Sequence, residues 1–135
     1  MKLGMIGLGK MGANMTRRLL RNDHDVVGFD LSEDAVQEIQ AAGAGGATSL
    51  DALVDRLAPP RVLWMMVPAG DPVDQTIDTL LPLVDDGDIL IDGGNSNYKD
   101  TLRRADRVQE HGVHYVDVGT SGGVWGLEQG YSMMV

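Results

Sequence analysis

Short apolar runs alternate along the chain with longer segments in which apolar residues recur at every third or fourth position. Short apolar runs predict strands, and the longer periodic segments predict helices. The run Arg61–Val67 (RVLWMMV) is apolar after its first residue and lies between prolines, which is typical of a strand buried on both faces of a parallel sheet. Main strands are predicted at 3–6, 25–30, 61–67, 88–92 and 113–118.

The predicted helices carry start and stop signals. Ser32 and Ser49 are expected to be N-caps, and Asp71 is expected to cap a helix that begins at Pro72. Strands and helices alternate, which predicts an α/β fold with a doubly wound, mostly parallel, Rossmann-like sheet and helices on both faces. Helices are predicted at 11–21, 33–42, 50–57, 72–84 and 98–111, a loop at 119–123 and a further strand from 131.

A glycine-rich turn follows the first strand. Gly7, Gly9 and Gly12 form G-x-G-x-x-G, and Asp30 closes the next strand about 20 residues later, as in dinucleotide-binding sites. The first glycine permits the tight turn, the second lets the backbone approach a pyrophosphate, and the third lets the helix pack on its strand. A glycine-rich turn of another kind would not explain Asp30. The predicted cofactor residues here are Gly7, Leu8, Gly9, Lys10, Met11, Gly12, Asp30, Leu31 and Ser32.

The residue types around Asp30 favour NAD over NADP. A carboxylate accepts hydrogen bonds from ribose hydroxyls, whereas it repels a 2′-phosphate by about 4 kcal/mol per charge pair at ~4 Å and an effective dielectric constant of ~20. An NADP site normally supplies an arginine just after this strand, but Leu31 and Ser32 stand here. We therefore expect NAD to bind more tightly than NADP.

Composition excludes several classes of function. The 135 residues carry a net charge of −9, which argues against nucleic-acid binding, and contain no cysteine. His24, His111 and His114 are scattered, so no metal site is predicted. No apolar run approaches the ~18 residues of a membrane span. We expect a single cytoplasmic domain over residues 1–135, with no membrane partner.

Two later motifs resemble one enzyme family. The segment Asp92–Arg104 (DGGNSNYKDTLRR) and the turn Gly119–Gly123 (GTSGG) closely resemble 6-phosphogluconate dehydrogenase, the decarboxylating enzyme of the pentose phosphate pathway. Related β-hydroxyacid dehydrogenases carry a Ser-Thr motif in place of the first. The resemblance implies that Asn95 touches both nicotinamide and sugar. It also implies further cofactor contacts from Val67, Pro68 and Ala69, and substrate contacts from Ser121, Gly122 and Gly123.

Three departures from the family pattern resemble its shorter, NAD-preferring branch. Pro68 replaces a lysine, and Val124-Trp125 replaces a pair of glutamates. Asp30-Leu31-Ser32 replaces the Asn-Arg-Thr of members that use NADP, in agreement with the electrostatic argument. The cofactor implied is NAD.

The resemblance implies oxidation of 6-phospho-D-gluconate, or a similar sugar acid, with loss of CO2 to give ribulose 5-phosphate. In the family a Lys and a Glu of a second, all-helical domain transfer the protons, and this domain also forms the dimer. None of Lys2, Lys10 and Lys99 is placed to be that base. We therefore expect no catalytic residue in this chain, the helical domain to be absent from it, a homo-oligomeric full-length enzyme, and NAD binding without turnover by residues 1–135 alone.

Other interpretations remain open at the level of sequence. The chain could serve another β-hydroxyacid dehydrogenase or an imine reductase, or it could be a non-catalytic NAD-sensing domain. Asn95 and Ser96 could simply cap the helix that follows. A solvated helix face is expected for Arg17, Arg18 and Arg21 on the first helix. On the last predicted helix, Arg103 and Arg104 are expected at the surface or in a contact with another domain.

Overall fold

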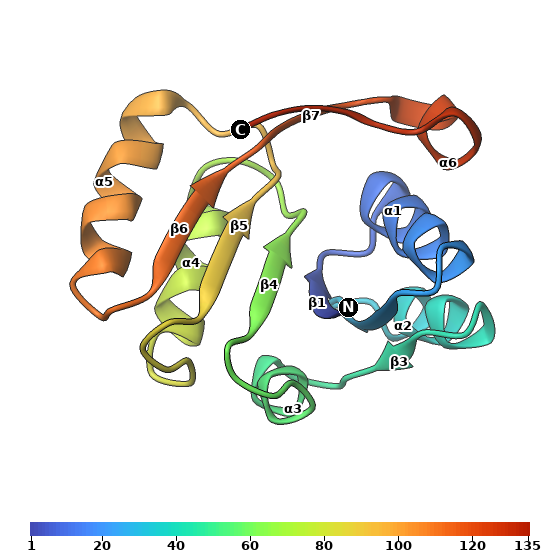
Figure 1. Cartoon of the computed structure of the whole chain (residues 1–135), viewed down its shortest axis with the longest axis horizontal. Coiled ribbons are helices and arrows are strands. Elements are labelled where there is room, and N and C mark those ends of the chain that lie inside the picture. Colours follow the sequence, from blue (N-terminus) through green and yellow to red (C-terminus); the bar gives the residue numbers. More distant parts are fainter.

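The computed structural model describes residues 1–135 and contains a six-stranded parallel sheet with helices on both faces (Figure 1). The strand order is β3-β2-β1-β4-β5-β6, so the chain starts in the middle of the sheet and winds outward in both directions. This confirms the predicted doubly wound fold. The strands of the sheet are β1 (Lys2–Ile6), β2 (Asp25–Phe29), β3 (Gly45–Gly46), β4 (Val62–Met65), β5 (Ile89–Asp92) and β6 (His114–Asp117).

The helices form two layers around this sheet. Side chains of α1 and α2 pack in one buried cluster, and side chains of α3, α4 and α5 pack in the other, on the opposite face. Figure 1 shows α4 and α5 beside β5 and β6, and α1 and α2 beside β1 and β3. The main helices are α1 (Lys10–Arg21), α2 (Glu33–Ala41), α3 (Leu50–Asp55), α4 (Asp71–Leu80) and α5 (Tyr98–Gln109). None of them is long and apolar enough to cross a membrane.

Strand β1 joins the two layers because alternate side chains of a strand point to opposite faces. Leu3 and Met5 belong to the cluster under α1 and α2, whereas Ile6 belongs to the cluster under α3, α4 and α5. Gly4 is also turned toward the second layer, where a Cβ would meet Leu63 at 2.8 Å. The central strand is therefore buried on both faces, as is usual in a parallel sheet covered by helices on both sides.

The last residues form a separate unit. The predicted loop at 119–123 is instead partly a strand, β7 (Gly119–Ser121), which pairs antiparallel with β8 (Ser132–Met134) in a second sheet. A short helical turn, η1 (Gly123–Trp125), and helix α6 (Gly126–Gln129) connect them. In Figure 1 this unit crosses above α1.

The arginines at the end of α1 attach this unit to the domain. Arg18 donates to the carbonyl oxygens of Leu127 at 3.1 Å and Glu128 at 3.4 Å, and Arg21 donates to the Glu128 carboxylate at 2.9 Å. Arg21 is exposed, as a solvated helix face predicts, and Arg18 is half-buried. The contacts of both with this unit were not predicted, because their partners lie about a hundred residues further along the chain, where local helix periodicity gives no information.

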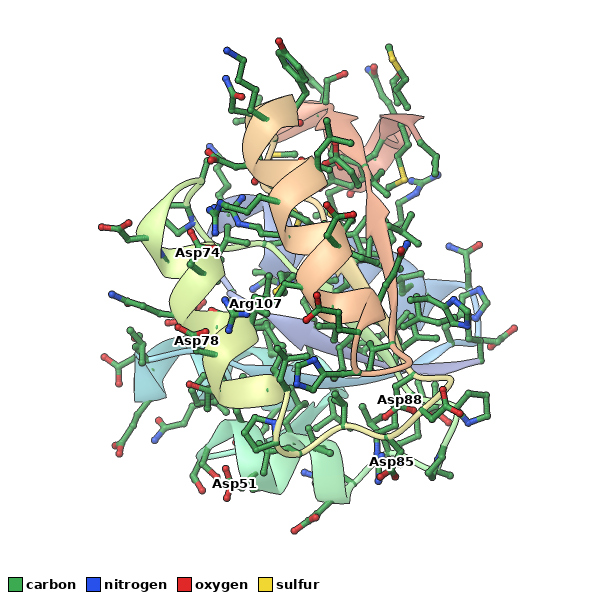
Figure 2. The ribbon with its side chains drawn as sticks, turned by 90° about the vertical axis from the view of Figure 1, so that its left-hand side faces the viewer. Asp51, Asp74, Asp78, Asp85, Asp88 and Arg107 are labelled. Atoms are coloured by element: carbon green, nitrogen blue, oxygen red, sulfur yellow. The ribbon has the colours of Figure 1, made fainter.

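Two further expectations need correction. Asp71 is the first residue of α4, and Gly70, with φ of +96°, precedes it as the N-cap. Arg104 is not on the surface but fully buried, because it reaches from α5 to α4 and donates to both carboxylate oxygens of Asp74 at 3.0 Å. Figure 2 shows Asp74 and Asp78 of α4 facing α5, with Arg107 of α5 close to Asp78.

A buried carboxylate at the start of β5 predicts acid sensitivity. Burial opposes ionisation of Asp88, but hydrogen bonds from the main chain of Arg61 and Asp85 and from the Arg61 side chain outweigh it, so the pKa of Asp88 lies below its usual range. A folded-state pKa below the unfolded value of about 3.9 contributes stability above that pH and loses it as the pH falls. We expect the free energy of unfolding in urea to decrease as the pH falls below about 4.

The matched variant for this prediction is Asp88→Asn, which keeps the side-chain shape but cannot ionise. This variant should be less stable than the unaltered chain at pH 7, and its stability should decrease less as the pH falls. Asp117 acts in the opposite sense, because burial and the nearby Asp92 carboxylate raise its pKa. The comparison between the two chains therefore isolates Asp88, and equal acid dependence in both would contradict the prediction.

Candidate functional site

The glycine-rich turn joins β1 to α1 at the carboxyl end of the sheet. Gly7 has φ of +93°, and a Cβ there would meet the carbonyl oxygen of Met66 at 2.5 Å. A Cβ on Gly12 would overlap the carbonyl oxygen of Gly7. Gly9, the N-cap of α1, is exposed and has no atom within 4 Å of its Cβ position. Two glycines therefore permit close packing within the protein, whereas Gly9 leaves open space beside the free N–H groups of the helix.

Asp30 directly follows β2, beside this turn. Its carboxylate accepts hydrogen bonds from the main-chain N–H of Leu8 at 2.7 Å and of Ser32 at 2.8 Å. These bonds hold the acid against the glycine turn at a fixed orientation and leave each oxygen a further lone pair. Ser32 itself caps α2 by accepting from the N–H of Ala35.

A cavity of about 870 Å³ lies at the carboxyl ends of the parallel strands. Ligand sites of open α/β sheets occur at this position, and the volume is within the usual range for small-molecule sites. The acid at the end of β2, the glycine turn and the loop after β5 all contribute to it. The predicted residues that line it are Gly7, Gly9, Lys10, Met11, Gly12, Asp30, Leu31, Val67, Pro68 and Asn95.

The other predicted cofactor residues do not line this cavity. Leu8 turns its side chain into the core beneath α2 and contributes only its N–H to Asp30, whereas Ser32 and Ala69 lie outside the lining. Sequence reasoning missed the polar face of α4, which contributes Gln75, Thr76 and Thr79. The spacings from Gln75 and Thr76 to Thr79, four and three residues, were a signal, because residues at these spacings share one side of a helix.

The loop after β5 connects the cavity to the β7 unit. Asn95 is exposed and has φ of +58°, and its side-chain amide pairs with both main-chain groups of Thr120. The Thr120 N–H donates to Oδ1 at 2.9 Å, and Nδ2 donates to the Thr120 carbonyl at 3.1 Å. Asn97, not Asn95 or Ser96, caps α5 by accepting from the N–H of Lys99. The interpretation of Asn95 and Ser96 as simple helix caps is therefore wrong.

The predicted substrate residues of the second motif follow Thr120 directly. Ser121 ends β7 and is exposed, and Gly122 and Gly123 both have positive φ, +150° and +47°. These three residues do not line the cavity. The Asn95–Thr120 hydrogen bonds nevertheless bring the start of their turn to the edge of the cavity at which Asn95 lies. Tertiary structure thus joins two motifs that are 25 residues apart in sequence.

The charges at the cavity are few. Lys10 and Asp30 are the charged side chains that line it, at the start of α1 and the end of β2. No group of three or more His, Cys, Asp or Glu side chains lies close enough together to hold a metal ion. The site offers main-chain N–H groups, one lysine and one acid, and this donor set suits a diphosphate joined to a ribose.

A glycine turn at a helix N-terminus, an acid after the second strand and a cavity over the carboxyl strand ends define a dinucleotide-binding α/β domain. Residues 2–135 match the NAD binding domain of 6-phosphogluconate dehydrogenase. The chain belongs to this family of NAD-binding domains.

Individual relatives agree with this assignment. The NAD(+)-dependent, decarboxylating 6-phosphogluconate dehydrogenase of Haloferax volcanii is 49% identical over the whole chain, which spans 44% of that protein. The solved structure of Plasmodium falciparum 6-phosphogluconate dehydrogenase superposes with a TM-score of 0.92 at 29% identity, over 99% of this chain and 30% of that one. The solved structure of Mycobacterium tuberculosis 3-hydroxyisobutyrate dehydrogenase superposes with a TM-score of 0.84 at 28% identity, over 93% of this chain and 42% of that one. The chain spans less than half the length of each of these proteins.

Proposed function

We propose that the chain is the coenzyme domain of an NAD-dependent dehydrogenase that oxidatively decarboxylates 6-phospho-D-gluconate. The nicotinamide end of NAD would lie toward Asn95, and its adenosine ribose would lie against Asp30. The substrate would be held between Asn95 and the Ser121-Gly122-Gly123 turn, where a hydroxyl and main-chain N–H groups suit an anion.

The observation that carries the proposal is the pairing of Asn95 with Thr120. It joins one end of the dinucleotide cavity to the Ser-Gly-Gly turn, so a cofactor in the cavity and a sugar acid at the turn would meet at one residue. A domain that only senses NAD has no need for this junction. The name of the Haloferax relative supports both the cofactor and the reaction.

The proposal assigns proton transfer to residues outside this chain. Of its three lysines, Lys10 alone lines the cavity, at the turn expected to bind the diphosphate. Lys2 begins β1 at the opposite end of the sheet, and Lys99 is exposed on the first turn of α5. Residues 1–135 should therefore bind NAD without producing NADH from 6-phosphogluconate, and the base and acid belong to a further, helical domain.

Cofactor preference tests the role of Asp30. We expect the chain to bind NAD more tightly than NADP in isothermal titration calorimetry, because the acid faces the position of a 2′-phosphate. Asp30→Asn should weaken NAD binding by about tenfold, the loss of one hydrogen bond to a charged group, and should bring the two affinities closer together. Tighter binding of NADP than of NAD by the unaltered chain would contradict the prediction.

The substrate class needs a separate experiment. The likeness to 3-hydroxyisobutyrate dehydrogenase keeps other β-hydroxyacids as the alternative substrates. Imine reductases share the fold, so imines belong in the comparison as well. The decisive measurement is a substrate panel on the complete protein that carries this domain, with NAD and NADP. Turnover of 6-phosphogluconate with release of CO2 supports the proposal, and turnover confined to another β-hydroxyacid or to an imine overturns it.

A further inference from the structure

A carboxylate with no exposed surface lies beneath the Asn95 loop. Asp92 ends β5 and accepts three hydrogen bonds, two of which come from the loop that follows it. Its Oδ1 accepts from the N–H of Gly94 at 3.0 Å, and its Oδ2 accepts from the Ser96 hydroxyl at 2.5 Å. The third donor is the Tyr115 hydroxyl of the neighbouring strand β6, at 3.0 Å.

The two loop bonds flank Asn95. Because Asp92 holds the residue before it and the residue after it, the intervening residue is turned away from the carboxylate into the left-handed region, at φ of +58°. Asparagine tolerates this region better than most residues, but single residues there persist only where the surroundings fix them. The Asn95 side chain then points to Thr120 rather than to the core.

A buried arginine also faces the Asp92 carboxylate. The Arg104 guanidinium on α5 lies 3.9 Å away, and its Nη1 has no other partner although it is buried. Burial and the Asp92 charge raise the pKa of Tyr115, which keeps its hydroxyl protonated as a donor. A buried carboxylate that accepts three hydrogen bonds beside a guanidinium is held at a fixed orientation.

We propose that Asp92 is a positioning residue: through Gly94 and Ser96 it orients Asn95, and so fixes the junction between the cofactor cavity and the Ser121 turn. Asp92 itself is neither in the cavity lining nor within reach of a ligand. The part of this inference that concerns NAD rests on the proposed function, whereas the part that concerns Thr120 does not.

Hydrogen exchange of the Thr120 amide tests the structural part without any ligand. In Ser96→Ala, which removes the loop hydroxyl alone, the exchange rate of this amide measured by NMR should rise by about tenfold or more, because its acceptor Asn95 is no longer oriented. Asp92→Asn, which cannot accept from all three donors, should change it in the same direction. Ser96→Thr retains the hydroxyl and should restore slow exchange.

Tyr115→Phe is the matched control, because it removes a hydrogen bond from the same Asp92 oxygen but on the side of β6. Amides of β1 and β4 report global stability in all four variants. Faster exchange at Thr120 with unchanged rates in β1 and β4, in Ser96→Ala and not in Tyr115→Phe, supports the inference. An unchanged Thr120 rate in Ser96→Ala, or the same acceleration at every amide, overturns it.

Ligand binding separates this inference from the proposed function. NAD and ADP-ribose share the adenosine and diphosphate, but only NAD reaches the Asn95 end with its nicotinamide. Ser96→Ala should bind NAD about tenfold more weakly, and ADP-ribose with unchanged affinity. If the unaltered chain binds neither ligand, the proposed function fails. If it binds both and Ser96→Ala alters neither affinity, the positioning role at the cofactor fails.

Discussion

Replacing Asp74 with alanine is expected to lower the free energy of unfolding by about 3 kcal/mol. Asp74 accepts two of the three hydrogen bonds that the buried Arg104 guanidinium donates; the third goes to the Gly70 carbonyl. Removal of Asp74 therefore leaves that cation in the core without its main partner. The hydrogen bonds from Arg104 are the main reason that the pKa of Asp74 lies well below its usual range. The expected loss of stability lies at the lower end of the range for a broken buried ion pair, because the Asp92 carboxylate remains 3.9 Å from the arginine.

Urea denaturation at neutral pH measures this effect, and Arg103→Ala provides its control. Arg103 also pairs with Asp74, at 3.1 Å, but its side chain is 54% exposed. Water screens an exposed pair, so this variant should unfold at nearly the same urea concentration as the unaltered chain. Equal losses from Asp74→Ala and Arg103→Ala would contradict the claim that burial of Arg104 makes the difference.

Two glycines of the turn, Gly12 and Gly9, should separate the effect on stability from the effect on cofactor binding. Gly12→Ala is expected to cost about 3 kcal/mol of stability or more, because its methyl group would overlap the backbone of Gly7 and neither backbone segment can move freely. Gly9→Ala meets no atom within 4 Å and should cost less than about 1 kcal/mol, the difference between these residues at a helix N-cap.

The effect of Gly9→Ala on NAD binding should be large although its effect on stability is small. Gly9→Ala should weaken binding by at least about tenfold although the protein remains stable, because the methyl group would occupy the space through which a pyrophosphate approaches the helix N-terminus. Thermal unfolding and calorimetric titration of the same samples measure the two properties. A stable Gly9→Ala chain that binds NAD with undiminished affinity would show that the diphosphate does not lie at this turn.

The alternation of apolar runs and periodic segments predicted the order of elements because this information is local. The strand at β1 and the helix at α1 follow from residues that are neighbours in sequence, and so does the glycine turn between them. Strand ends were less accurate: the predicted strand 61–67 is observed as β4 at Val62–Met65. Met66 and Val67, beyond the end of β4, already line the cavity, although the apolar run continues through them.

Sequence alone predicted those parts of the candidate site at which one particular residue type is required. Gly7 and Gly12 have backbone neighbours that exclude a side chain, and Asp30 occupies the position at which an acid would meet a ribose. Gln75 and Thr79 were missed because threonine and glutamine on a helix are ordinary solvent-facing residues. Only the position of α4 over the cavity gives them a part in the site.

The sequence by itself determined the fold class, the glycine turn and the acid that follows β2, because each depends on the local pattern or on a steric need of one residue. Only the tertiary structure decided the roles of Arg104, Asp92 and Asn95. The partners of Arg104 lie 30 residues away on another helix, and those of Asn95 lie 25 residues away on β7. An arginine on a polar helix has the same local pattern whether it contacts water or a buried carboxylate, and the free energy that distinguishes the two arises only when the layers pack.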